Sequence, residues 1–300
     1  MRRFHLTSLT AVTCSLVTAH ASAQSFNIDF GSASNVPDAS YAAAGLAGTW
    51  NAIETITPGS PASLVGLDGS AIEVTIDTYA APTTMVLDDP GTTGDDNKLM
   101  DDFVPGLGDV VVSFNFANLR PGHYDVVTYG WVPTLPTQGS LIWVEPGAFN
   151  GQIVSGAWPG ALTPGVTHAV HRVEVTDGHL TVAGAGSYWW TSGAFNGIQF
   201  VELTPQSADI NEDGFISLLD LRTFMRYWRE FNAGHGCDGF NPGTVCRADL
   251  DMDRDVDQHD LNILLEHIRR AMGKKAEEAS GTALPEPTDA DLSDEALRDN

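Results

Sequence analysis

The chain has 300 residues, of which 15 are basic and 39 acidic, and its formal net charge is -24 at pH 7. A surface this acidic repels phosphate groups, which argues against binding to bare nucleic acid or to anionic lipid. Beyond the first residues no run of about 20 apolar residues occurs, so no membrane-spanning helix is expected. The length suggests two domains rather than one.

Residues 1–23 have the pattern of a secretory signal peptide. Arg2 and Arg3 give a positive start, a short apolar stretch follows, and Ala21 to Ala23 offer a small-x-small cleavage site. We therefore expect a secreted or cell-surface protein whose mature chain begins near Gln24.

The three cysteines separate into one that is expected to be lost and two that remain. Cys14 lies in the signal peptide, and its use for lipid attachment is less favoured because the preceding residue is larger than the usual Gly or Ala. Cys237 and Cys246 form an even pair in an exported chain, which indicates a disulfide bond. The alternative is a metal site that adds His235 and Asp238, although zinc sites usually have more closely spaced cysteines.

Short strands dominate residues 24–204. Between Ile72 and Asp77 apolar and polar residues alternate with the period of a half-buried strand. Further candidate strands, separated by clusters of Gly, Pro, Asn and Asp, follow at 109–116, 123–131, 140–145, 168–175, 179–184 and 195–203. Asp177-Gly178 predicts a tight hairpin between two of them. The series predicts a mainly β fold, with a β-sandwich or jelly roll over 24–204.

The composition changes near residue 204, and two helical segments are expected over 205–272. Their apolar stripes are Leu221, Phe224, Met225, Trp228 and Phe231 in the first and Leu261, Leu264, Leu265, Ile268 and Met272 in the second. Residues 273–300 are polar and acidic without apolar periodicity, which predicts a disordered acidic tail.

Each helical segment follows a calcium-loop pattern. Calcium prefers hard oxygen ligands, which an EF-hand-type loop supplies from positions 1, 3, 5, 7, 9 and 12, position 7 through its carbonyl. In the first loop these positions hold Asp209, Asn211, Asp213, Phe215, Ser217 and Asp220. In the second they hold Asp249, Asp251, Asp253, Asp255, Asp257 and Asp260. A single match could be an acidic helix-capping turn, but the repeated spacing predicts two bound Ca²⁺ ions.

Positions 6 and 8 of the loops have structural roles. Gly214 stands at position 6 of the first loop, where the backbone turns sharply, and Arg254 replaces it in the second. A non-Gly residue with positive φ costs on the order of 1 kcal/mol. Ile216 and Val256 make position 8 apolar and are expected to tie each loop to its neighbour.

Two calcium loop–helix repeats that each end in Asp resemble a dockerin domain over residues 209–272. Dockerins bind cohesin modules and anchor polysaccharide-degrading enzymes to a scaffold or cell surface, so the resemblance implies a cohesin-like or other protein partner. The family's partner-reading positions correspond to Leu218-Leu219 and Gln258-His259. These pairs differ from each other and from the Ser/Thr pairs typical of the family, which leaves the kind of partner open.

Residues 109–203 are similar to galactose-binding-like jelly rolls of exported bacterial proteins. In FNFANLRPGHYDVVTYGW a Pro-Gly turn precedes a Tyr-rich strand, and the Asn-Gly-Ile strand FNGIQFVEL closes the series. The matching residues form turns and core, so the resemblance implies a fold and leaves the ligand open.

The catalytic residues are unknown, because no GxSxG, HExxH, Walker or GxGxxG-to-helix motif is present. Glycoside hydrolysis needs two carboxylates that flank the scissile bond. The candidate acids are Asp125, Glu145, Glu174 and Asp177, and the candidate bases or metal ligands are His123, His168, His171 and His179. The sequence places no two of these acids together, and the histidines are expected at the surface.

Aromatic residues suggest a second type of site. Tyr188-Trp189-Trp190 are consecutive, and neighbours on a strand point to opposite faces, so the three rings cannot share one core. An exposed ring can stack on a sugar, whereas the alternative is core packing. The candidates for sugar stacking are Trp131, Trp143, Trp158, Tyr188, Trp189 and Trp190.

Three functions follow from these features. The first is a non-catalytic carbohydrate-binding or adhesive component of extracellular polysaccharide processing. The second is a polysaccharide-active hydrolase that carries a dockerin module. The third is a structural cell-surface protein.

Overall fold

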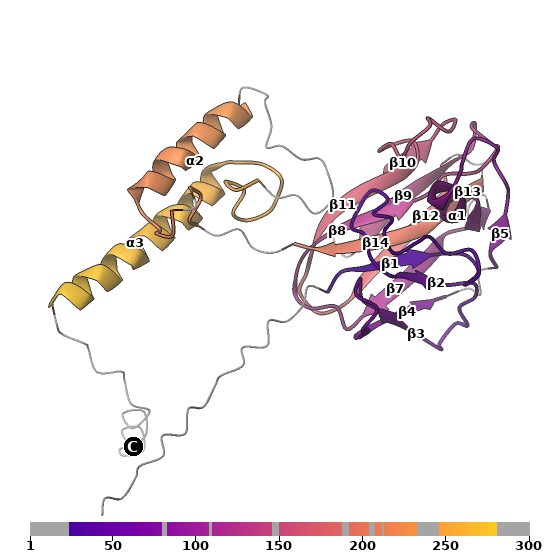
Figure 1. Ribbon diagram of the computed structural model, residues 1–300, viewed down its shortest axis with the longest axis horizontal. Helices are drawn as coiled ribbons and strands as arrows, with labels where there is room; N and C mark the ends of the chain where they lie inside the picture. The colour runs from indigo at the N-terminus through magenta and orange to yellow at the C-terminus, as the bar shows by residue number, and fades with distance from the viewer. Residues whose placement is uncertain are drawn as a thin grey trace, which may run out of the picture.

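A computed structural model of the chain describes residues 24–79, 83–107, 110–145, 150–187, 192–203, 208–211, 213–232 and 246–280. The fold is mainly β, as the sequence predicts, and two longer helices follow the strands (Figure 1). The elements in chain order are β1 (Phe26–Asp29), β2 (Trp50–Ala52), β3 (Ala62–Val65), β4 (Ala71–Thr78), β5 (Met85–Val86), α1 (Asp95–Met100), β6 (Asp102–Leu107), β7 (Val112–Ala117), β8 (Gly122–Tyr129), β9 (Gly139–Glu145), β10 (Gln152–Ser155), β11 (His168–Val175), β12 (Leu180–Gly186), β13 (Ser192–Phe195), β14 (Gly197–Glu202), α2 (Leu218–Glu230) and α3 (Gln258–Ser280).

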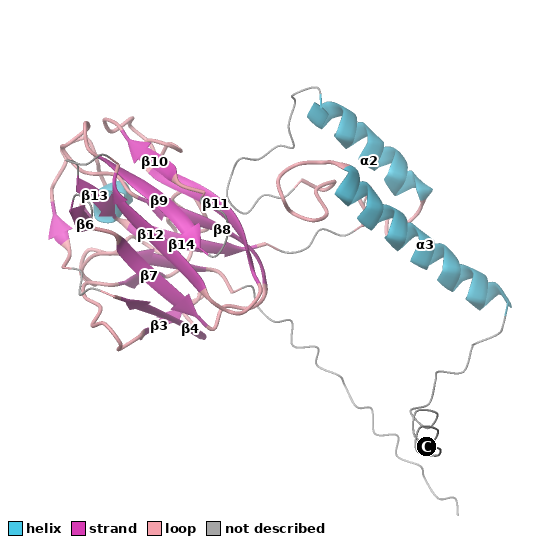
Figure 2. Cartoon of the chain, turned by 180° about the vertical axis from the view of Figure 1, so that it is seen from behind, coloured by secondary structure: helices cyan, strands magenta, loops and turns pink. Residues whose placement is uncertain are grey.

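The strands form two large sheets that pack face to face (Figures 1 and 2). One has five strands in the order β11-β8-β14-β1-β2, and the other has six in the order β10-β9-β12-β7-β4-β3. Their pairs are antiparallel, except that β1 and β2 are parallel. A small sheet, β13-β6-β5, lies at one end of the sandwich.

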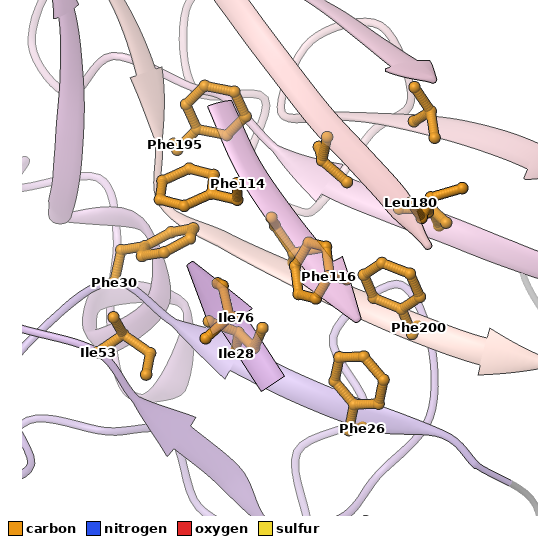
Figure 3. Packing of buried hydrophobic residues seen from close by; sticks show 14 of the residues in the cluster. Phe26, Ile28, Phe30, Ile53, Ile76, Phe114, Phe116, Leu180, Phe195 and Phe200 are labelled. Carbon is orange, nitrogen blue, oxygen red and sulfur yellow. The ribbon is translucent and has the colours of Figure 1, made fainter. Parts of the chain in front are cut away.

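Phenylalanine rings from both sheets fill the space between them (Figure 3). The ring of Phe30 stacks on that of Phe114 with centroids 4.4 Å apart, and Phe26 stacks on Phe200 at 4.6 Å. Alternation along β1 sends Phe26, Ile28 and Phe30 into this core, so the residues between them point to the opposite face of the five-stranded sheet.

That opposite face, called the outer face below, is also covered. A second apolar cluster joins Leu99 and Met100 of α1 to Val127 and Tyr129 of β8, together with partly buried residues between 36 and 44. Coverage on both faces explains why every residue of β1 is buried. Polar side chains on the outer face therefore lie inside the protein instead of in water.

All seven predicted strands are present. The strands β1, β2, β3, β5, β6, β10 and β13 and the helix α1 were not predicted. All of these strands but β6 have four residues or fewer, too few to show a clear period. The predicted hairpin at Asp177-Gly178 is wrong. Gly178 does turn with φ of 81°, but β11 pairs with β8 and β12 pairs with β7 and β9. The turn therefore crosses from one sheet to the other.

The two helices follow their loops as predicted. Phe224, Leu264 and Ile268 are buried in a cluster that also contains the two position-8 residues, Val256 and the partly buried Ile216. The apolar tie between the loops is therefore confirmed. Three residues of the predicted stripes, Met225, Leu265 and Met272, are exposed instead.

Helix α3 continues past the predicted end at residue 272 to Ser280, so the tail predicted from 273 begins with helix. Residues 281–300, like the predicted signal peptide, lie outside the described part of the chain. No helix among the described residues is long and apolar enough to span a membrane.

Candidate metal centre

Both predicted loops make their sharp turn at position 6. The φ angle is 87° at Gly214 and 79° at Arg254, so the second loop adopts the left-handed conformation without a glycine. The carboxylate at position 1 accepts a hydrogen bond from the position-6 amide in each loop, over 2.8 Å from Gly214 N to Asp209 and 3.1 Å from Arg254 N to Asp249. The two loops therefore share one backbone path.

The carboxylate at position 12 makes the same hydrogen bonds in both loops. Asp220 accepts hydrogen bonds from the amides at positions 3 and 9 of its loop, over 3.2 and 2.7 Å. Asp260 accepts the equivalent bonds over 3.2 and 2.8 Å. Both carboxylates are buried, and each belongs to the first turn of the following helix. These bonds fold the two ends of each loop around one interior.

Carboxylates gather in the second loop. Oxygens of Asp249, Asp251 and Asp253 lie within 4.8 Å of one another, and so do oxygens of Asp255, Asp257 and Asp260. Burial, followed by the charge of Asp260, raises the pKa of Asp249 to about 7. One oxygen of Asp249 and one of Asp255 have no hydrogen-bond partner among the described residues. A set of hard oxygens with excess negative charge suits Ca²⁺.

The first loop carries less charge but has the same donor chemistry. Asn211 donates to Asp213 over 3.0 Å, so these two ligand positions are neighbours. Ser217 caps α2, since its hydroxyl accepts from Leu219 N. The side chain of Phe215 is 64% exposed, and only its carbonyl can serve as a ligand. The residues of both loops thus fit calcium.

An ion-pair network joins the second loop to the outer face of the sandwich. Asp125 on β8 is completely buried and accepts two bonds from Arg172 on β11, over 2.9 and 3.0 Å. The guanidinium of Arg254 donates a third bond to Asp125 over 3.0 Å. Arg172 also lies 3.4 Å from Asp249, the first ligand position.

Apolar contact supports the same junction. Met252 of the second loop is buried in a cluster with Val201 and Leu203 at the end of β14. Arg254 therefore has a role beyond its strained backbone, because its side chain reaches a buried carboxylate on the other module.

The candidate catalytic acids have other environments. Asp125 accepts hydrogen bonds from two arginines and joins the second loop to the sandwich. Glu145 accepts a bond from the indole of Trp143 over 3.0 Å at the surface, and Glu174 and Asp177 are exposed. The catalytic residues remain unknown.

The expectation that the histidines are surface residues is wrong for two of them. His168 and His171 are buried: the ring of His168 packs against that of Tyr129, and Nε2 of His171 lies 3.0 Å from the carbonyl oxygen of Asn150. Burial lowers the pKa of both, that of His168 to about 4, so His168 is neutral at pH 7. His123 is half-buried and His179 is exposed.

The aromatic candidates also separate. Trp131 is buried, with its indole N–H donating to the carbonyl of Gly156 over 2.9 Å, so its predicted role in sugar stacking is wrong. Trp158 packs against it at a centroid distance of 5.3 Å and is half-buried. Trp143 lies half-buried on the solvent side of β9, between the buried Ile142 and Val144.

Some predicted residues lie outside the described part of the chain. They include Tyr188, Trp189 and Trp190, as well as Cys237, so the Cys237–Cys246 bond stays a prediction.

Sequence reasoning missed two polar residues. The first is Arg172, which closes the network around Asp125. The second is Asp29, which alternates with apolar residues along β1 and would be assigned to solvent by its period. The burial of every residue of β1 comes from the cover on the outer face, which a local pattern does not reveal.

No protein-family model and no curated protein sequence matches the chain. Among solved structures it is similar to a beta-glucuronidase from Bacteroides uniformis, with 11% identity over 60% of this chain and 18% of the other, at a TM-score of 0.38. It is also similar to TmCBM61 in complex with beta-1,4-galactotriose, with 11% identity over 43% of this chain and 88% of that one, at a TM-score of 0.27. This chain thus spans less than a fifth of the glucuronidase, and similarity at this level assigns no function.

Replacing Arg254 by Gly tests the junction. Removal of the strained side chain alone would stabilise the protein by about 1 kcal/mol. Because the change also takes one guanidinium from buried Asp125, we expect a net loss of about 1–2 kcal/mol in the free energy of unfolding. Chemical denaturation measures it, with Gly214→Ala as the control for backbone strain alone. A stabilised Arg254→Gly variant would contradict the junction.

His168 predicts a pH dependence of stability. Its pKa is about 4 in the folded protein, against the ordinary value of 6.5 for a histidine in an unfolded chain, so between these values the unfolded chain binds a proton that the folded chain does not. This contribution is complete above pH 6.5 and is lost as the pH falls toward 4, by about 2–3 kcal/mol. We expect His168→Gln to weaken the acid sensitivity of unfolding, whereas His179→Gln leaves it unchanged. Parallel curves for wild type and His168→Gln would disprove this assignment.

Proposed function

We propose that this chain is an exported calcium-binding protein in which residues 205–272 act as a dockerin-like attachment module. One observation carries the proposal: two loops 40 residues apart repeat the same bonds, from the position-6 amide to position 1 and from the position-3 and position-9 amides to position 12. Export to the cell surface or beyond rests on the sequence of residues 1–23.

Calcium would supply the positive charge that the loops lack. The second loop holds six aspartates, and bringing them together costs free energy through mutual repulsion. Two ions, one in each loop, would remove this repulsion and stabilise the folded module by mass action. Both helices would then be held at their first turns through Asp220 and Asp260.

The partner of this module would be a protein. Leu218 and Leu219, the residues at the family's partner-reading positions, are 63% and 55% exposed at the start of α2. With Ile216 and the 53% exposed Met272 they line one hollow beside α3. Gln258 and His259 in the second repeat are polar and exposed. A cohesin-like module with an apolar contact would fit the first repeat better than the second.

For the sandwich we propose a non-catalytic carbohydrate-binding or adhesive role within extracellular polysaccharide processing. Trp143 favours it, because its ring lies on the solvent side of a sheet beside a carboxylate, Glu145, that can accept bonds from sugar hydroxyls. A dockerin-bearing polysaccharide hydrolase and a structural surface protein are the alternatives.

Calcium binding is tested by removing one ligand from each loop. We expect Asp209→Ala and Asp249→Ala each to lower the calcium stoichiometry of the full chain by one, as measured by isothermal titration calorimetry. Chelation should lower the melting temperature of the wild type, because at a calcium concentration 100 times Kd binding adds about 2.7 kcal/mol. An unchanged melting profile and stoichiometry would disprove the proposal.

Sugar binding is tested by titrating the full chain with soluble galactan, xylan and β-glucan while following tryptophan fluorescence. We expect Trp143→Ala to weaken binding at least tenfold, since a stacked ring supplies much of the contact in a shallow site. Tyr79→Ala, which removes a ring that is 84% exposed on another strand end, should have no effect. If no glycan perturbs the fluorescence of the wild type, the structural role replaces the binding role.

A further inference from the structure

Asp29 is a buried carboxylate on β1, an inner strand of the five-stranded sheet. It ends β1, between Gly197 of β14 and Ala52 of β2, and its exposure is zero. Its backbone carbonyl accepts from Ile53 N over 2.8 Å, but neither carboxylate oxygen has a hydrogen-bond partner among the described residues. Because β1 is an inner strand, this carboxylate is held away from water.

A second buried carboxylate lies beside it. Asp102 begins β6, is 2% exposed, and its Oδ1 also has no partner among the described residues. The Asp102 carboxylate rests against Gly31, two residues after Asp29: a Cβ at Gly31 would meet Asp102 Oδ2 at 2.0 Å and Oδ1 at 3.0 Å. The missing side chain of Gly31 thus makes room for this carboxylate next to β1.

Asn196 contributes an amide oxygen beside the two carboxylates. Its side-chain N–H groups donate to the carbonyls of Met100 over 2.8 Å and Asp102 over 3.3 Å, which fixes the orientation of the amide. Its backbone carbonyl accepts from Phe30 N over 2.9 Å, and the next residue, Gly197, pairs with Asp29, so Asn196 lies one residue from the strand partner of Asp29. The Oδ1 atom, which can only accept, is buried and has no partner among the described residues.

Three neighbouring residues therefore present four buried oxygens that need a positive partner. A buried polar atom without a partner costs about 1–3 kcal/mol, and a carboxylate costs more. The contrast with Asp125 is direct, since that buried carboxylate holds two guanidinium groups.

We propose that Asp29, Asp102 and Asn196 hold a calcium ion inside the β-sandwich. Hard oxygens suit this ion, and two carboxylates balance its two charges. The four buried oxygens supply part of the six to eight ligands that Ca²⁺ takes. This site is separate from the two loops of the other module and does not depend on the function proposed for them.

The titration of the pair agrees with this chemistry. Burial, and then the charge of Asp102, raises the pKa of Asp29 well above its usual value, and burial raises the pKa of Asp102 to about 7. A proton and a cation are the two positive partners that a buried carboxylate can take. The proton and the cation are therefore the two partners that an experiment has to separate.

The test uses the full chain with both loops disabled by Asp209→Ala and Asp249→Ala. After dialysis against calcium and then against metal-free buffer, plasma mass spectrometry gives the metal bound per chain. We expect one calcium in this background and none after adding Asp29→Asn. Adding Asp68→Asn, which removes the same charge from an exposed turn, should leave one. No metal in the background, or one metal retained with Asp29→Asn, would overturn the proposal.

Thermal unfolding separates the cation from the proton and guards against misfolding. In the loop-disabled background, added CaCl₂ should raise the melting temperature by several degrees, and Asp29→Asn or Asp102→Asn should abolish this shift while unfolding stays cooperative. A protonated Asp29 closely matches asparagine in shape, so equal melting temperatures of background and Asp29→Asn at every calcium concentration would show that a proton is the partner. Calcium binding by the two loops is measured separately, with the single variants Asp209→Ala and Asp249→Ala. The loop sites and the sandwich site can therefore be disproved independently.

Discussion

Burying a carboxylate requires a positive charge or a proton to accompany it, and this constraint shapes the whole molecule. The chain has 39 acidic and only 15 basic residues, so its own side chains cannot neutralise every acid that folding encloses. At Asp125 two arginines do so. In the second loop and around Asp29 the described residues leave carboxylate oxygens without a donor, and a cation from solution is the partner that we propose for them.

Carboxylates are buried in this protein because the outer face of the five-stranded sheet is covered. An antiparallel sheet of a sandwich usually has one wet face. Here α1 and residues between 36 and 44 cover one part of the outer face, and the second loop contacts the end of β14 through Met252. Side chains that alternate away from the phenylalanine core thus enter a second interior, where charge is costly. Asp29, Asp125 and His168 share this environment.

Arg254 shows how a local exception follows from a distant contact. Considered within its loop, it is the wrong residue, because a glycine would reach φ of 79° without strain. Its guanidinium reaches Asp125 across the junction between the modules. The cost of the strained backbone is therefore set against the benefit of neutralising a buried carboxylate. The residue that departs from the repeat therefore links the repeat to the sandwich.

The sequence by itself determined whatever depends on neighbours along the chain. Period-2 alternation and the turn residues between apolar runs located seven strands, and the spacing of oxygen-bearing residues located both loops together with the positive φ at Gly214 and Arg254. Only the tertiary structure decided which faces are dry. That choice buried Trp131, His168 and Asp29, and it paired β11 with β8 instead of β12. The reason is physical: alternation fixes which residues share a face, whereas burial of that face depends on segments distant in the sequence.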